Sequence, residues 1–232
     1  MLQMRIPLQF DSNSWDASHT SDDVQWQTGW PDLVNTLATK EIHLKTVRAL
    51  RRKAYKAEGM VPTPEVIGDD FDSAANSRIY LLHENSQPLG TIRLLLGHSH
   101  YNLPTFFSTQ FSKEIAQHVG GPYLEVSRLA VIHPESAGDP RHIMALMQNV
   151  TAEADRNASR YILAALDREH LSFYSSLGFR AISEARPLPG WPEAVTLGCL
   201  DFFAERSRLR HHYGFRNFFS TRNHAGDRST AQ

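Results

Sequence analysis

Residues 124–132, LEVSRLAVI, place a carboxylate and a guanidinium three positions apart in an otherwise apolar run. The apolar and β-branched residues of this run predict a buried strand. Burying either charge costs several kcal/mol unless that charge is paired. Glu125 and Arg128 must therefore have partners in the fold, or a function that justifies their burial.

Strands and helices alternate around this stretch. Residues 77–84 and 89–96 read as a hairpin, because the turn sequence NSQP separates them. Apolar side chains at helical spacing predict a helix over residues 40–58 and another after Pro140, and residues 161–166 read as a buried strand. Strands in hairpins and in strand–helix–strand units together predict an α/β (α+β) fold, with helices on the faces of a mixed sheet.

The chain is expected to form one domain over residues 39–217. Residues 1–38 are expected to be a partly mobile arm, because residues 11–23 are polar and carry no periodic apolar pattern. The polar tail, residues 218–232, is expected to be disordered.

Three further segments carry charged residues that indicate function, in addition to the 124–132 strand. They are RRKAYKAEG at 51–59, DDFD at 69–72 and GTIRL at 90–94. Taken in this order, the four segments resemble the autoinducer synthase and N-acyl amino acid synthase branch of the GNAT acyltransferases. The resemblance covers roughly residues 45–135, and it implies a GNAT-like, mostly antiparallel sheet and N-acyltransferase activity.

The resemblance also implies roles for particular residues. It implies a catalytic role for Glu125 and substrate-binding roles for Arg51, Tyr55, Asp69, Asp72, Arg93 and Arg128. Residues 172–179, SFYSSLGF, resemble a helix-to-strand junction of GNAT proteins, where a tyrosine often protonates the leaving thiolate. Tyr174 stands at that position and is the second catalytic candidate.

A structural interpretation competes with these roles, because the arginines could pair with the acidic residues and pin the 60–75 loop to the sheet. Amide formation from a thioester needs a neutral amine, and Glu125 is the best base available to remove its proton. Burial raises the pKa of such a carboxylate, and an arginine neighbour lowers it. In a regular strand Glu125 and Ser127 share a face, whereas Arg128 points to the other face unless a bulge intervenes. This orientation favours a structural role for Arg128 more than for Glu125, and leaves open whether Arg128 is structural or catalytic.

The donor can be inferred from residues 133–141, HPESAGDPR, which follow the 124–132 strand. GNAT enzymes that use coenzyme A usually have a glycine-rich loop here, whose amides bind the diphosphate. Prolines remove amide donors and carboxylates repel phosphate, so this loop suits coenzyme A poorly. The resemblance instead implies acyl carrier protein as donor, with its acyl-phosphopantetheine thioester and no permanently bound cofactor.

The acceptor implied by the resemblance is the amine of an amino acid. Acyl-homoserine lactone synthases use S-adenosylmethionine and usually carry a tryptophan shortly after the helix aromatic, where this chain has EGMVP at residues 58–62. That synthase activity and a related branch linked to exosortase-type sorting remain alternatives. A non-catalytic module that binds acyl groups or carrier protein is an alternative of another class.

A basic stretch near the C-terminus offers a docking surface. Arg206, Arg208 and Arg210 lie among aromatic residues, and such a helix can bind an acidic protein or nucleic acid. Because acyl carrier protein is acidic, we expect these arginines to dock it, and we expect no nucleic-acid partner.

Composition excludes several classes. With 24 basic and 25 acidic residues, the surface as a whole is not built for nucleic acid or anionic membrane. The one cysteine, Cys199, rules out an intramolecular disulfide and a cysteine-based zinc site. His98 and His100 lack a third ligand at convincing spacing, so no metal is expected. No transmembrane segment or signal peptide is recognisable, and we expect a cytoplasmic protein.

Overall fold

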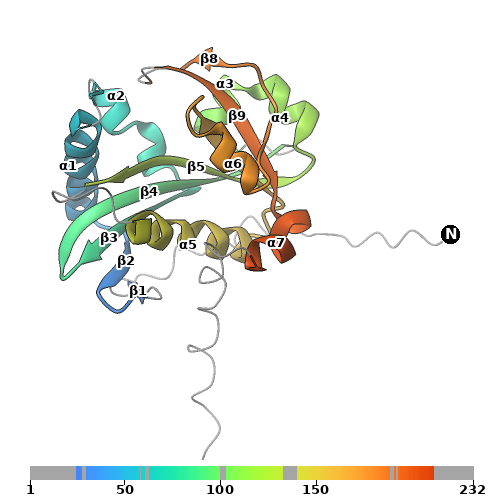
Figure 1. Cartoon of the computed structure of the whole chain (residues 1–232). Coiled ribbons are helices and arrows are strands. Elements are labelled where there is room, and N and C mark those ends of the chain that lie inside the picture. Colours follow the sequence, from blue (N-terminus) through green and yellow to red (C-terminus); the bar gives the residue numbers. More distant parts are fainter. Residues whose placement is uncertain are drawn as a thin grey trace, which may run out of the picture.

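A mixed sheet runs through the molecule with helices on both faces (Figure 1). The computed structural model describes residues 25–27, 30–57, 59–60, 63–99, 103–132, 140–188, 191 and 193–211. The strands are β1 (Gln25–Gln27), β2 (Leu33–Leu37), β3 (Ser77–Glu84), β4 (Gln87–His98), β5 (Pro122–Val131), β6 (Tyr161–Leu166), β7 (Arg180–Ala181), β8 (Arg186–Pro187) and β9 (Ala194–Asp201). They follow the order β1-β2-β3-β4-β5-β6-β9-β7, and β8 pairs with β9.

Among the described strands, β5 and β6 pair in parallel and all other neighbours pair antiparallel. The predicted mixed, mostly antiparallel sheet is therefore confirmed. The helices are α1 (Glu41–Ala57), α2 (Pro64–Ile67), the 3-10 helix η1 (Asp70–Ser73), α3 (Phe106–Gln110), α4 (Ser112–His118), α5 (Pro140–Arg156), α6 (Leu171–Ser176) and α7 (Phe202–His211).

Strand alternation divides the core between the two faces of the sheet. On one face, Leu94 and Leu124 pack in a large cluster with Leu146 of α5, and α6 and α7 add to the same cluster. On the other face, Val47 of α1 packs over Ile79 in a smaller cluster. A third cluster joins α3 and α4 to β5, β6 and β9. We call the side covered by α1, α3 and α4 the α1 face, and the other side the α5 face.

Strand β5 is irregular at the position that the site later uses. Its parallel pairing with β6 runs from Tyr123 to Val126, and both strands continue beyond that point without pairing to each other. Across the ladder to β4, Arg93 lies opposite Ser127 and Thr91 lies opposite Ala130, so β5 holds one residue more than β4 between these pairs. This extra residue forms a β-bulge.

The sheet begins earlier than the domain boundary expected at residue 39. Strand β2 lies within the predicted arm and pairs with β3 along its whole length. Two of its buried positions hold Asn35 and Thr36, so an apolar alternation is missing from the sequence. The Asn35 Nδ2 donates a hydrogen bond to the Ala145 carbonyl of α5, at 2.8 Å. Residues 1–24 and the expected tail, 218–232, lie outside the described residues.

Candidate active site

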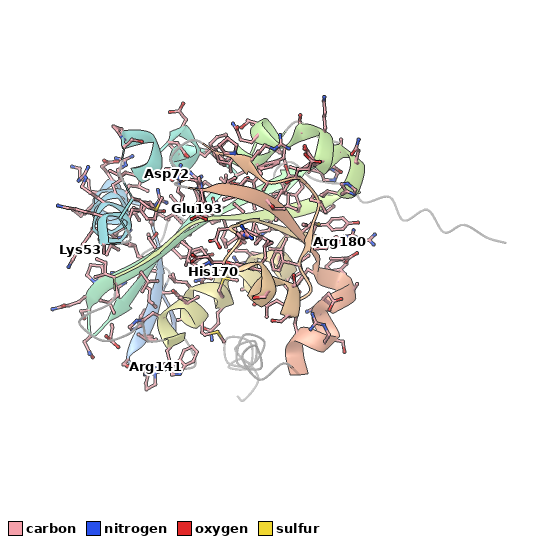
Figure 2. All side chains as sticks on the ribbon, turned by 45° about the horizontal axis from the view of Figure 1, so that its top comes forward. Lys53, Asp72, Arg141, His170, Arg180 and Glu193 are labelled. Carbon is pink, nitrogen blue, oxygen red and sulfur yellow. The ribbon has the colours of Figure 1, made fainter. Side chains whose placement is uncertain are left out.

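Six charged side chains meet on the α1 face, between α1, η1, β4 and β5. They are Arg51, Asp69, Asp72, Arg93, Glu125 and Arg128. Three are basic and three acidic, so their formal charges cancel. Figure 2 labels Asp72, the central aspartate of this cluster, beside α1 and α2. We refer to these six residues as the charged cluster.

Two aspartates bridge three arginines. Asp72 accepts hydrogen bonds from Arg51, at 2.7 Å, and from Arg93, at 3.1 Å. Asp69 accepts from Arg93 and, at 2.9 Å, from Arg128. Arg51 also donates to the carbonyl of Ile67, at 2.9 Å. The loop that carries both aspartates is thus tied to α1, β4 and β5, as the structural interpretation of the sequence anticipates.

Burial is graded across the charged cluster. The side chains of Arg51 and Arg93 are fully buried and that of Asp72 is 2% exposed, whereas Arg128 is 9% and Asp69 18% exposed. Arg51 and Arg93 thus form the buried floor of the cluster. A small molecule arriving from solvent would meet Arg128 and Asp69 first.

Arg128 does not take the orientation expected in a regular strand, because the bulge that the prediction named as its exception is present. Arg128 has a φ of 55°, in the left-handed region, and its guanidinium reaches Asp69 on the α1 face. Arg93 reaches the same aspartate and also donates to the Ser127 hydroxyl, at 3.1 Å. The extra residue therefore lets Ser127 and Arg128 point to the same face, where a regular strand would separate them.

Glu125 is fully buried on the same face. Its Oε2 accepts a hydrogen bond from the backbone N–H of Phe107 in α3, at 2.7 Å. Its Oε1 makes no hydrogen bond with any residue in the described part of the chain. Burial raises the pKa of Glu125, and Arg93, the Phe107 amide and the hydroxyls of Thr105 and Ser127 oppose that rise without cancelling it. Glu125 therefore holds a proton more tightly than an exposed glutamate does.

Ion pairing shifts the pKa values of Asp69 and Arg93 in the direction that favours their charged forms. Burial acts to raise the pKa of Asp69, but Arg93 and Arg128 outweigh it, so that pKa is lowered. Burial acts to lower the pKa of Arg93, but Asp69, Glu125 and Asp72 outweigh it and raise it. Asp69 and Arg93 therefore remain ionised at neutral pH, whereas Glu125 has an increased proton affinity.

Aromatic side chains cover the cluster. The rings of Phe71 and Phe106 meet edge to face, with centroids 6.4 Å apart. Arg93 lies 5.9 Å from the Phe71 centroid and Arg128 lies 5.8 Å from that of Phe106. Tyr55 of α1 adjoins the arginines, and burial raises its pKa although Arg51, Arg128 and Arg93 oppose this. Sequence reasoning missed Phe106, because nothing in its local spacing links it to the cluster.

Tyr174 lies away from the charged cluster. It belongs to α6, packs against the core of the α5 face and meets Phe179 edge to face, with centroids 5.4 Å apart. Burial raises its pKa, and Asp167 raises it further. Tyr174 is therefore a protonated phenol at neutral pH. Helix α6 follows β6 at the end where β5 and β6 no longer pair.

Two hollows adjoin these elements. One, of about 260 Å³, lies beside the unpaired end of β6 and is lined by Arg168, Leu171, Ala185, Glu193, Ala194 and Thr196. The other, of about 310 Å³, lies between Tyr123 and helices α3 and α4. Neither is lined by a member of the charged cluster. Within the described residues, no three His, Cys, Asp or Glu side chains are grouped as metal ligands.

Helix α7 presents fewer available charges than its sequence indicates. Arg206 pairs with Asp155 of α5, at 2.9 Å. Arg208 pairs with Glu205 and donates to the carbonyl of Ser176, at 2.9 Å. The side chain of Arg210 lies outside the described residues. So do residues 133–139 of the loop that is predicted to bind the coenzyme A diphosphate poorly.

A known protein family matches this chain. The profile of the family described as "N-acyl amino acid synthase FeeM" matches residues 46–201. No curated protein sequence matches the chain significantly. Within the described residues, no helix has the length and apolarity needed to cross a membrane.

Solved structures share the fold. FeeM, an N-acyl amino acid synthase from uncultured soil microbes, is similar with a TM-score of 0.64 and 20% identity, over 75% of this chain and 93% of that one. The acyl-homoserine lactone synthase LasI gives a TM-score of 0.53 and 15% identity, over 75% and 95%. MesI, described as a CoA-dependent acyl-homoserine lactone synthase, gives 0.52 and 19%, over 75% and 88%.

Proposed function

The chain belongs to the N-acyl amino acid synthase FeeM family and is an acyltransferase, and from this premise we propose that it moves a fatty acyl group from acyl carrier protein to the amine of an amino acid. One observation carries the proposal. Glu125, a buried carboxylate with a raised pKa, lies in β5 directly before the position where β5 separates from β6.

The separation of the two strands suits an extended thioester arm. Beyond Val126, the edge of β5 that faces β6 has no strand partner in β6. Backbone groups at such an edge can hydrogen-bond the amides of a phosphopantetheine arm, as an added strand would. The arm would then run along β5 and bring its thioester close to Glu125. The apolar side chains around the 260 Å³ hollow beside β6 would accommodate part of the acyl chain.

The chemistry can be written with the protein's own groups. Glu125 takes a proton from the acceptor's ammonium, and the neutral amine then attacks the thioester carbonyl. Because Glu125 is fully buried, the proton reaches it through the neighbouring Ser127 hydroxyl. The C–N bond forms, the C–S bond breaks, and the leaving thiolate takes a proton from the Tyr174 phenol. The nitrogen gives up its second proton as it becomes an amide; this proton restores the Tyr174 phenol through solvent, and Glu125 releases its own proton to solvent.

The acceptor would be held at the exposed side of the charged cluster. Arg128 is a guanidinium at the rim, and guanidinium groups bind carboxylates in a forked geometry. The acceptor's carboxylate would pair with Arg128 beside Tyr55, while the ring of Phe106 covers the pair. Arg51, Arg93, Asp69 and Asp72 would act by fixing Arg128 and Glu125 in place rather than by contacting the acceptor.

S-adenosylmethionine also carries an amino acid end, so the same geometry could serve a lactone synthase. Mass spectrometry of lipid extracts from cells overproducing the protein names the acyl chain and the acceptor together. N-acyl amino acids are the expected product. Acyl-homoserine lactones as the product would overturn the choice of acceptor.

The donor is tested with purified protein, by comparing a fatty acyl carrier protein with the matching acyl-coenzyme A. We expect the carrier protein to give the much higher kcat/KM. Efficient use of acyl-coenzyme A with no advantage for the carrier protein would overturn the donor. The proposed donor needs no cofactor beyond its own phosphopantetheine arm and implies a reaction in the cytoplasm.

A further inference from the structure

Helix α1 presents a continuous basic surface to solvent. Its outward side chains include Lys45, Arg48, Arg52, Lys53 and Lys56. Viewed down the helix axis, at about 100° per residue, these five side chains fall within an arc of less than half the circumference. One of these five side chains has an acidic partner in the same helix: the Arg48 guanidinium lies 3.8 Å from the Glu41 carboxylate. The other four side chains form no ion pair or hydrogen bond with any residue that the structure describes. We call these five residues the α1 basic face.

The inner side of the same helix belongs to the proposed active site. Arg51 enters the charged cluster, and Tyr55 adjoins its arginines. Because an α-helix with its side chains is about 10 Å across, the α1 basic face lies about one helix diameter from the cluster. A partner bound there would be close to the proposed chemistry.

Helix α1 also lies over the part of β5 that has left β6. Ile132, at the end of β5, packs against the cluster that contains Val47 and Leu50 of α1. Arg51 is linked through Asp72 to Arg93 of β4. Arg93 lies opposite Ser127, and Ser127 directly follows the last residue of β5 that pairs with β6. The α1 basic face therefore lies near the open end of the β5–β6 pair.

Helix α7 lies at the other end of this pair. It begins directly after Asp201, which is opposite Tyr161, the first paired residue of β6. Figure 1 shows α1 and α7 at opposite ends of the sheet, and Figure 2 shows Lys53 and Arg180 on opposite sides of the molecule. The phosphopantetheine arm of a carrier protein bound at α7 would have to reach around the end where β5 and β6 are paired. Arg206 and Arg208 of α7 are also paired with Asp155 and Glu205.

We propose that the α1 basic face is the docking surface for the acidic surface of acyl carrier protein. This inference rests on the proposed donor and assigns the docking role to α1 in place of Arg206, Arg208 and Arg210. From Lys45 to Lys56 the face is about 16 Å long, at 1.5 Å per residue, which matches an acidic helix of three turns. Opposite charges on the two partners would speed encounter and fix the orientation of the arm.

The test compares two charge reversals of equal size. One variant carries Lys45→Glu, Arg52→Glu and Lys56→Glu, and the matched control carries Arg180→Glu, Arg206→Glu and Arg208→Glu. Each is assayed with acyl carrier protein at low and high salt, and with a small acyl-pantetheine thioester that needs no docking. The thioester assay and the thermal midpoint report on folding, so a misfolded variant is recognised by losing both activities.

For the α1 variant we expect kcat/KM with acyl carrier protein to fall about tenfold or more at low salt. The loss should shrink as salt screens the charges, and turnover of the small thioester should stay within a factor of two. The control should lose far less of its carrier-protein activity. If the control shows the larger selective loss, or if both variants lose equally, the proposal is wrong.

The single variants Lys45→Glu and Lys56→Glu keep the test decisive if the triple variant does not fold. Each should show a smaller loss in the same direction, and unchanged kcat/KM in both would refute the α1 surface. Sedimentation with anionic phosphatidylglycerol vesicles covers the other source of negative charge. Vesicle binding that depends on the α1 cations, with unchanged use of carrier protein, would replace the proposal by a membrane contact. If wild-type protein uses only acyl-coenzyme A, the donor itself is wrong.

Discussion

Replacing Glu125 by Gln isolates the proton that the proposed reaction must remove. The amide keeps the volume of the side chain, and its carbonyl oxygen can still accept the Phe107 N–H that Oε2 accepts now. It cannot take a proton. Loss of a general base typically lowers the rate about 10²–10⁴-fold, which corresponds to roughly 3–5 kcal/mol in the activation free energy. We expect kcat with a small acyl-pantetheine thioester to fall by that factor, measured as release of free thiol.

The fold should survive this change, because Arg93 keeps Asp69 and Asp72 as partners. A folded-state pKa that is raised means that the native protein binds more protons than the unfolded chain between the two pKa values. Glu125 therefore lowers stability as pH rises through its folded pKa, and the Gln variant should lack this fall. Its free energy of unfolding at pH 7 should match or exceed that of wild type. Turnover within a few-fold of wild type, with an unchanged pH–rate profile, would remove Glu125 from the mechanism.

Three further predictions follow from the packing. Arg51→Met should cost about 3 kcal/mol of unfolding free energy by removing one of the two buried arginines that pair with Asp72, whereas Arg48→Met at a half-exposed position of the same helix should cost less than about 0.5 kcal/mol in denaturant titration. Tyr174→Phe should slow turnover with an alkyl thioester and should spare an aryl thioester, whose thiolate leaves without protonation; equal losses on both would refute the acid role. Arg128→Gly should be at least as stable as Arg128→Ala in thermal unfolding, against the usual order in strands, because Gly adopts the φ of 55° at no steric cost; a clearly more stable Ala variant would show that the bulge is lost.

Periodicity and spacing were enough to predict most of the sheet. Strands β3 and β6 have the predicted bounds and β4 extends two residues beyond its predicted range at each end, because apolar alternation and turn residues are local signals. Strand β2 could not be found in this way, since Asn35 and Thr36 occupy buried positions that a half-buried strand normally gives to apolar residues. The Asn35 Nδ2 donates a hydrogen bond to α5, 110 residues away. No local sequence pattern shows that bond.

The helix after Pro104 shows the same limit on a smaller scale. Residues 106–118 form two short helices that meet at Phe111, and Thr105 caps the first of them in a reciprocal pair with Ser108. The first helix is also held by Glu125, which accepts the Phe107 N–H from across the sheet. Glu125 therefore positions α3, and with it the Phe106 ring over Arg128, in addition to any role as a base. No spacing in the sequence connects residues 106 and 125.

Burial in an apolar strand indicated that Glu125 and Arg128 need partners, and the resemblance to the autoinducer synthase and N-acyl amino acid synthase branch implied the other four members of the charged cluster. Their roles were not identifiable, since pairing depends on the bulge in β5. Bulges bend a strand and increase its local twist. Here the extra residue turns Arg128 onto the face of Glu125, and the bulge begins two positions beyond Val126, the last residue of β5 that pairs with β6. The same irregularity thus places the rim guanidinium and coincides with the opening proposed for the thioester arm. A change at residues 127–129 that restores a regular strand would therefore turn Arg128 away from the face of Glu125 and remove the guanidinium from the rim of the proposed site.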